Sequence, residues 1–344
     1  MKITVLLGGT SAERDVSLSS GLRIVDALRS RGHHVTPFDP ARGPISADQE
    51  KAMRAGKVVQ TAPPDPSTLR SLEQGSFIPS LGSRPEIQNA DVVFLALHGG
   101  MGEDGTIQAM LDMVGARYTG SGHLASALAM DKDLSKHLFR AAGVPTADWL
   151  MAPATEDEVA EVVGFPAIVK PSKQGSTVGL TLVRDPSRLA EAVEEAFKYD
   201  DEVMIERYVP GRELTVSVIG DEALPVGEIK AKHEIYDYEC KYTAGMATEE
   251  FPADLTADQT EEAQRLALAA FRALKLDGYA RIDFRLTPEG EFSCLEANTL
   301  PGMTELSLLP QAAQAAGISF EELCDRIARD AGRGTRDAGE SQER

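Results

Sequence analysis

The sequence has few of the features of a secreted or membrane protein. Its 344 residues include three cysteines, an odd number without metal-ligand spacing, which excludes a disulfide framework. No apolar run approaches the ~18 residues of a membrane-spanning helix. The first residues, MKITVLLGG, reach glycine too early for a signal peptide. We therefore expect a cytoplasmic protein that has no membrane partner.

Positive charge is also scarce. Lys and Arg number 35 against 54 Asp and Glu, which gives a formal net charge of −19 at pH 7. Nucleic acid phosphates require stripes of Lys and Arg, so nucleic acid is not an expected partner. An acidic protein that binds a nucleotide must concentrate its cations at the site. The length predicts two or three domains with a sizeable core.

Polar side chains gather on a predicted hairpin near the end of the chain. Its strands, residues 280–286 and 291–295, flank a Thr-Pro-Glu-Gly turn. Asp283 lies on the polar face of the first strand, and Glu296 and Asn298 share a face at the end of the second. Two carboxylates and an amide oxygen suit Mg²⁺ or Mn²⁺, with nucleotide phosphates completing the octahedron. The alternative is a solvated polar face on an exposed hairpin.

The N-terminal pattern is typical of a doubly wound α/β domain. Residues 3–7 predict a buried parallel strand, and an amphipathic helix is expected over residues 17–30. The glycine loop between them lacks GxGxxG spacing. It contains Glu13, which suits an ammonium group better than pyrophosphate, the alternative being a helix-start acid. A second buried strand, 91–97, ends at His98, where open α/β sheets bind ligands; a structural histidine is the alternative.

Three other stretches have simpler expectations. Residues 39–89 are rich in Pro, Gly and Ser and predict strands and loops. One helix is expected over residues 125–142, with Lys132 and Lys136 on one face. Residues 145–153 have the composition of a linker into a second domain.

Residues 165–180 predict a strand, a Gly/Ser/Thr loop and another strand. No helix follows the loop, so it is not a Walker-type loop, but its backbone could cover a triphosphate beside Lys170. A mobile surface loop is the alternative. The next strands carry Glu206 and Glu213, which could meet adenine and ribose. A long loop with three tyrosines, residues 228–250, is expected to be functional because such loops are uncommon in compact domains.

Taken in order, nine segments resemble D-alanine–D-alanine ligases of the ATP-grasp family. They are GGTSAERDVS, ALHGGMGEDG, YTGSG, MDK, VKPSKQGSTVG, IERYVPGRE, YDYECKY, YARIDF and LEANTLPGMT. The resemblance spans about residues 1–330 and is poor over 40–89. It implies a doubly wound parallel-sheet domain (Rossmann-like, pre-ATP-grasp) followed by a two-lobed ATP-grasp fold. The implied parts are residues 1–120, a central lobe at 121–210, a C-terminal lobe at 211–331 and a flexible tail at 332–344.

The resemblance implies a reaction and its cofactors. ATP phosphorylates the carboxylate of one D-alanine, and the amine of a second D-alanine displaces phosphate, giving D-alanyl-D-alanine for peptidoglycan synthesis. Two Mg²⁺ ions, which Mn²⁺ can replace, would lie on Asp283, Glu296 and Asn298. A homodimer through the N-terminal domain is also implied.

Roles for the remaining site residues come from the same resemblance. Phosphate contacts fall to Lys132, Lys170 and Lys241. Adenine and ribose contacts fall to Glu206, Arg207, Val209 and Glu213, the first three partly through their backbone. Glu13 would bind the ammonium of the first D-alanine and His98 would lie near its carboxylate. Arg281 and the Gly302 N–H would form the oxyanion hole, and Ser307 and Leu308 would meet the second D-alanine. Ser176 and Tyr242 would close the site over the substrates with Glu13.

Three other functions compete with this one. An ATP-binding module without catalysis is disfavoured because every expected metal ligand and Arg281 are present. A nicotinamide-dependent dehydrogenase would need GxGxxG, although Asp39 follows a plausible second strand. A related ligase could use D-lactate or D-serine, but the YDYECKY loop with Tyr242 favours D-alanine. Glu305 and Leu306 depart from the family pattern, so the resemblance does not predict the details of the second-substrate pocket.

Overall fold

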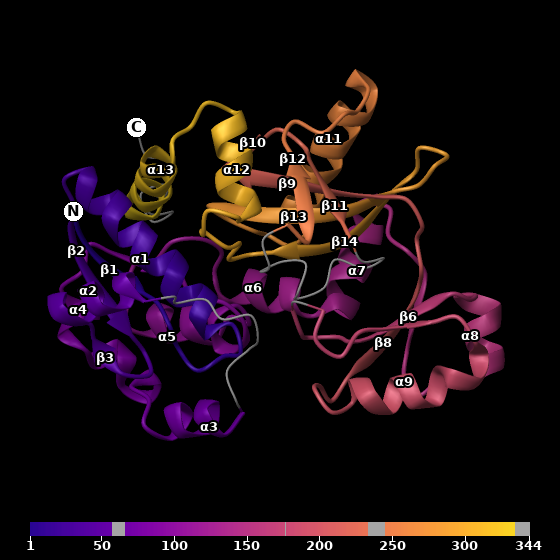
Figure 1. Ribbon diagram of the computed structural model, residues 1–344, viewed down its shortest axis with the longest axis horizontal. Coiled ribbons are helices and arrows are strands. Elements are labelled where there is room, and N and C mark those ends of the chain that lie inside the picture. The colour runs from indigo at the N-terminus through magenta and orange to yellow at the C-terminus, as the bar shows by residue number, and fades with distance from the viewer. Residues whose placement is uncertain (57–65, 176, 233–244, 334–344) are drawn as a thin grey trace, which may run out of the picture. The chain divides into compact units, whose positions relative to one another are not determined.

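The computed structural model describes residues 1–56, 66–175, 177–232 and 245–333 as a mixed α/β fold with three sheets (Figure 1). The chain forms two compact units. Unit 1 comprises Met1–Ser126, Leu276–Ala280 and Thr299–Arg344, and unit 2 comprises Ala127–Lys275 and Arg281–Asn298. The expected boundaries near residues 120 and 210 stay predictions. Within the described residues, no helix is long and apolar enough to cross a membrane.

Unit 1 is built on a four-stranded sheet of order β3-β2-β1-β4 (Figure 1). The strands β1 (Lys2–Leu6), β2 (His34–Asp39) and β4 (Val92–Leu95) are parallel, and the short β3 (Gly43–Pro44) is antiparallel to β2. All four residues of β4 are buried, as expected for a parallel strand covered on both faces. The helices of this unit include α1 (Arg14–Ser30), α5 (Thr106–Met113), α12 (Leu308–Ala315) and α13 (Phe320–Arg333). The expected N-terminal parallel sheet is therefore present.

The prediction of strands and loops over residues 39–89 was wrong for most of that stretch. Apart from β3, its described elements are helical: α2 (Ala47–Ala55), α3 (Pro66–Gln74), η1 (Ile78–Ser83) and α4 (Pro85–Gln88). Ser46 and Gln49 form a capping box at the start of α2, and proline begins α3 and α4. Proline and serine usually indicate loops, but in this stretch they lie at helix starts. Proline fits the first helical position, and serine caps the helix N-terminus.

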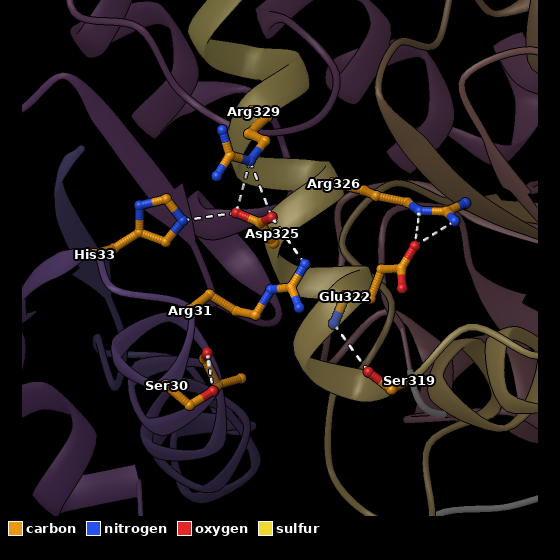
Figure 2. Close-up of polar contacts among 9 residues, drawn as sticks. Ser30, Arg31, His33, Ser319, Glu322, Asp325, Arg326 and Arg329 are labelled. Carbon is orange, nitrogen blue, oxygen red and sulfur yellow. Dashed lines mark hydrogen bonds and ion pairs between the residues drawn. The ribbon is translucent and has the colours of Figure 1, made fainter.

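Helix α13 is anchored to the turn after α1 through Asp325 (Figure 2). An oxygen of this buried carboxylate lies 2.7 Å from His33 Nε2, and Arg329 Nε donates to both oxygens at 2.9 Å. Arg31 lies 3.5 Å away. Burial opposes ionisation of Asp325, but the hydrogen bonds from Arg329 and His33 outweigh it and lower the pKa of this carboxyl.

Unit 2 contains two sheets (Figure 1). The four-stranded sheet has the order β5-β8-β6-β7 and is antiparallel throughout. Its strands are β5 (Trp149–Met151), β6 (Ala167–Pro171), β7 (Thr181–Val183) and β8 (Val203–Arg207). Helices α8 (Glu156–Val162) and α9 (Leu189–Ala196) share a buried apolar cluster with this sheet, including Val159, Val169 and Ala192.

The six-stranded sheet carries the predicted hairpin. Its order is β12-β11-β9-β13-β14, with β10 on β9. The strands are β9 (Arg212–Ile219), β10 (Glu222–Ala223), β11 (Gly227–Ala231), β12 (Ala247–Glu250), β13 (Tyr279–Leu286) and β14 (Phe292–Asn298). Helix α11 (Ala257–Ala273) contacts β9 and β14. The predicted second strand therefore extends three residues further, to Asn298.

Three other predictions were wrong. The long loop expected over residues 228–250 begins and ends in strands, β11 and β12, which pair with each other. The helix expected over residues 125–142 is two helices, α6 (His123–Met130) and α7 (Lys132–Ala141). Asp131 separates them, because its ψ of 100° is not helical and its carboxylate accepts from Leu134 N at 3.0 Å as the cap of α7. The expected linker at 145–153 contains β5, whose backbone pairs with β8.

Candidate active site

The hairpin of β13 and β14 brings the predicted metal ligands together. Asp283 lies directly opposite Glu296, and Arg281 lies opposite Asn298. The register shifts by one residue between Asp283 and Phe284. Asp283 pairs with Glu296 and Phe284 with Cys294, so Leu295 has no partner residue on β13. Residues opposite each other in an antiparallel pair point to the same face. The four polar side chains therefore share one face of the sheet.

Asp283 is buried and fixed by two neighbours. The Arg281 guanidinium donates to it through Nε at 2.9 Å and Nη2 at 2.8 Å, a two-pronged contact along one strand. Thr215 Oγ1 on β9 donates to the same carboxylate at 2.7 Å. The orientation of Asp283 is thus set from its own strand and from the adjacent one.

Lys132 links this hairpin to the predicted flap. Its Nζ lies 3.3 Å from Glu296 Oε2 and donates to the Gln174 carbonyl at 2.7 Å. Its backbone N–H donates to Ser172 O at 3.3 Å. As the first residue of α7, a buried Lys132 thus connects a carboxylate of β14 with the loop after β6.

Two lysines converge on Glu206. Lys170 Nζ on β6 donates to Glu206 Oε2 at 2.6 Å, and Lys136 Nζ on α7 donates to Oε1. Burial would raise the pKa of Glu206, but the charges of Lys170 and Lys136 dominate and lower it to about 2. Glu206 is therefore ionised at neutral pH, and its two lysines leave one positive charge in excess.

The other predicted nucleotide residues lie around Arg285. Its Nε donates to Val209 O at 3.1 Å and its Nη1 to Glu213 at 3.1 Å. Arg207 instead directs its half-exposed side chain to Asp148 and to the Val162 carbonyl. That placement leaves only its backbone for the predicted contact.

His98 in unit 1 joins the end of β4 to the loop before α12. Its Nδ1 lies 3.0 Å from Leu300 O, so Nδ1 carries the proton, because a carbonyl only accepts. Nε2 lies 3.2 Å from Ser20 Oγ, which can donate to it, and the same Oγ accepts from Met303 N at 3.1 Å. His98 therefore supports both sides of the Pro301–Gly302 turn, in agreement with the structural alternative for this residue. A substrate role stays a prediction.

Glu13 lies beside His98 in an acidic corner. Gly99 has a φ of +67°, which favours glycine, and a Cβ there would lie 2.9 Å from Glu13 Oε2. Glu103 is buried with Oε1 3.6 Å from His98 Nδ1. Burial raises the pKa of Glu103, and the charge of Glu13 raises it further, against the hydrogen bond to His98. Two neighbouring acids suit a cationic group such as an ammonium.

Gly302, predicted for the oxyanion hole, and Ser307, predicted for the second substrate, are close neighbours in unit 1. Ser307 Oγ accepts from Thr304 N at 2.9 Å, and Ser307 precedes α12, whose first residue Leu308 is buried. A Cβ on Gly302 would meet Ser307 Oγ at 2.7 Å, below any normal contact. Gly302 and Ser307 therefore form one compact turn.

The contacts of Asp39 argue against the alternative of a nicotinamide-dependent dehydrogenase. It is fully buried and forms an ion pair with Arg14. It also accepts from Gly9 N at 3.1 Å and Ala41 N at 2.9 Å. These contacts occupy the carboxylate that a dinucleotide ribose would need.

Three predicted residues, Ser176, Lys241 and Tyr242, lie outside the described residues. Three residues to which the sequence analysis gave no role contact predicted site residues. Lys136 donates to Glu206, Thr215 to Asp283 and Arg285 to Glu213. Their only signal was position, since Arg285 follows Asp283 by two residues and Lys136 follows Lys132 by four.

The residues of the hairpin fit a divalent ion. Two adjacent carboxylates and an amide oxygen form a hard, all-oxygen donor set, which Mg²⁺ prefers. Within the described residues, no group of three or more His, Cys, Asp or Glu side chains could hold a metal by itself. Such a partial set suits an ion that also takes phosphate oxygens from a nucleotide.

The chain matches known proteins over most of its length. Family models for the D-ala D-ala ligase N-terminus and C-terminus match residues 2–121 and 138–329. A D-alanine–D-alanine ligase of Geobacter sulfurreducens is 43% identical over 329 residues, covering 95% of this chain and 92% of the relative.

Two solved structures extend the likeness to the fold. The D-alanine–D-alanine ligase of Bacillus anthracis complexed with ATP matches with a TM-score of 0.75 and 32% identity, covering 98% of this chain and 99% of that one. A D-Ala:D-Ser ligase from Enterococcus faecalis matches with a TM-score of 0.79 and 27% identity, covering 96% and 99%.

The fold and these matches identify the class of protein as an ATP-dependent ligase. More specifically, the chain belongs to the D-alanine–D-alanine ligase family. The resemblance read from the nine sequence segments is confirmed. The mixed α/β fold with several sheets matches the structures of this family.

Proposed function

We propose that this protein joins two D-alanines to D-alanyl-D-alanine for peptidoglycan synthesis, converting ATP to ADP and phosphate. The observation that carries the proposal is the hairpin that sets Asp283 opposite Glu296 and Arg281 opposite Asn298, in a chain 43% identical to a D-alanine–D-alanine ligase. The sheet β5-β8-β6-β7 would be the central ATP-grasp lobe and the six-stranded sheet the C-terminal lobe.

The nucleotide would bind in unit 2. Lys132 and Lys170 would contact phosphates, together with Lys241. Glu206 and the backbone of Arg207 and Val209 would receive adenine, and Glu213, oriented by Arg285, would receive the ribose. Asp283, Glu296 and Asn298 would hold two Mg²⁺ ions, for which Mn²⁺ can substitute. When bound, these ions neutralise negative charge on the transferred phosphoryl group.

The chemistry then takes two steps. A carboxylate oxygen of the first D-alanine attacks the γ-phosphorus, the β–γ bridge breaks and ADP leaves. The amine of the second D-alanine attacks the carbonyl carbon of the acyl phosphate, loses a proton and expels phosphate. Arg281 and the Gly302 N–H would stabilise the oxyanion of the tetrahedral intermediate.

Substrate binding would fall to residues of unit 1. Glu13 would bind the ammonium of the first D-alanine and His98 would lie near its carboxylate. Ser307 would bind the carboxylate of the second, beside Leu308. Ser176 and Tyr242 would close over the substrates and exclude water, which otherwise hydrolyses the acyl phosphate. A homodimer and a cytoplasmic location complete the proposal.

A related ligase that uses D-serine is the second candidate, because one matching structure is a D-Ala:D-Ser ligase. One experiment separates the two. Purified protein receives ATP, Mg²⁺ and D-alanine, alone or with D-serine or D-lactate, and product masses are read directly. D-alanyl-D-alanine should dominate, and L-alanine should release no phosphate. Phosphate release without regard to handedness would contradict the proposal.

A further inference from the structure

Lys136 is a buried cation that the proposed reaction leaves without a role. It lies in the middle of α7 with a fully buried side chain. Its Nζ donates to Glu206 and, at 2.6 Å, to Thr146 Oγ1, and it lies 5.0 Å from the centre of the Trp149 ring. The Lys136 ammonium thus donates two hydrogen bonds and lies near an aromatic ring.

Packing alone does not explain a lysine at this position. Burying an ammonium is costly, and an apolar side chain of similar length is often equally stable or more so. Burial lowers the pKa of Lys136, against the opposing charge of Glu206. A charge kept in spite of that penalty points to a role for the charge itself.

Charge balance shows what that role is. Glu206 lies between Lys136 and Lys170, so the three side chains sum to one positive charge. Without Lys136, Glu206 and Lys170 would neutralise each other. Lys136 and Glu206 are almost fully buried, whereas the side chain of Lys170 is 11% exposed. Lys170 is therefore the most exposed member of the cluster, and the surplus positive charge is nearest to solvent there.

Lys136 is also tied to the metal hairpin. Thr146, which accepts from Lys136, donates to the Cys294 carbonyl at 2.7 Å, and Cys294 N donates to Pro145 O at 2.7 Å. Cys294 lies on β14, two residues before Glu296. Helix α7, the strand with Glu206 and the hairpin therefore share one polar connection.

We propose that Lys136 is a positioning residue that neutralises Glu206 and so keeps the charge of Lys170 available to the nucleotide phosphates. The inference rests on the proposed function, because it takes the phosphates of ATP as the ligand of Lys170. It predicts that loss of Lys136 weakens the binding of the phosphates more than the binding of the nucleoside.

A series of charge variants tests this directly. The summed charge of the cluster is +1 in the wild type, 0 in Lys136→Met, +1 again in Lys136→Met/Glu206→Gln and +2 in Glu206→Gln. Calorimetric titration with ATP and with adenosine gives the affinity for ATP divided by the affinity for adenosine. An effect of a variant on the adenine site changes both affinities alike and cancels in this ratio. We expect the ratio to fall on the order of tenfold in Lys136→Met. It should recover in the double variant and exceed the wild type in Glu206→Gln.

Arg140→Met is the matched control. It removes the same charge from the same helix and from the same Trp149 ring, 4.4 Å away, but contacts Asp148 rather than Glu206. Its affinity ratio should stay within twofold of the wild type. In turnover, Lys136→Met should raise KM for ATP more than it lowers kcat.

Each outcome decides the proposal. An unchanged ratio in folded Lys136→Met would make Lys136 merely structural. If that variant does not fold, the double variant and Glu206→Gln still differ by one charge, and equal ratios would overturn the inference. Failure of wild-type protein to bind ATP would instead refute the proposed function.

Discussion

Asp283 and Glu296 face each other across β13 and β14 because the pairing shifts by one residue at Leu295. Up to Phe284 and Cys294 the register is regular, and its continuation would set Asp283 opposite Leu295. Glu296 would then share the buried face of Cys294. The bulge moves Glu296 to the polar face, and such bulges often re-aim a side chain beside an active site.

Glu296→Gln should abolish turnover and leave the fold intact. The amide keeps the shape of the side chain but loses the charge that a divalent ion and Lys132 require. We expect kcat to fall at least ~100-fold, measured by phosphate release, with an unchanged circular dichroism spectrum. Glu291→Gln, at the exposed residue just before the same strand, is the control. Retained turnover would remove Glu296 from the metal site.

Gly302→Ala should impair the use of D-alanine without affecting ATP. The new Cβ would lie 2.7 Å from Ser307 Oγ, so it must displace either the hydroxyl or the Gly302 backbone N–H. We expect kcat/KM for D-alanine to fall about tenfold or more, with ATP affinity unchanged by calorimetry. Gly122→Ala meets only an ordinary contact at 3.6 Å and serves as control. Equal D-alanine kinetics in both variants would argue against a role for this turn.

Asp325→Asn should destabilise unit 1 in a pH-dependent way. The pKa of Asp325 is lowered in the folded protein, so its stabilisation is complete above its unfolded pKa of about 3.9. It is lost as pH falls through the folded pKa. We expect the melting temperature at pH 7 to drop by a few degrees, and the gap to the wild type to narrow below about pH 4. Asp221→Asn, in an exposed turn, should show no such convergence.

Raising the pH should favour D-alanine over D-lactate as the second substrate. The attacking amine must be neutral, so its reactive fraction grows with pH, whereas the hydroxyl of D-lactate gains nothing comparable. Product masses from mixtures of both acceptors, compared between pH 6 and pH 9, test this. A constant product ratio would speak against attack by a free amine.

Much of the fold could be predicted from the sequence, because periodicity is a local property. The buried strands β1 and β4, the helix α1 and the hairpin of β13 and β14 follow from apolar runs and turn residues. The break at Asp131 was missed because a capping aspartate inside an otherwise apolar-periodic stretch looks like a helical surface residue.

In the site, residue types could be predicted from the sequence, but their arrangement could not. Residue types pointed to Asp283, Glu296 and Lys170, but the bulge at Leu295 and the convergence of Lys136 and Lys170 on Glu206 depend on register and tertiary packing. No short sequence window contains that information. The roles of Ser176, Lys241 and Tyr242 stay predictions.

The position of Trp149 gives the protein a built-in optical probe. It is the single tryptophan of the chain, 9% exposed, with its indole N–H bonded to Asp133 at 2.6 Å and with Lys136 and Arg140 against its ring. Indole emission responds to nearby charge, and Trp149 on β5 lies directly opposite Glu206 on β8. Occupation of the lysine cluster should therefore be readable in native fluorescence, without labelling the protein or the nucleotide.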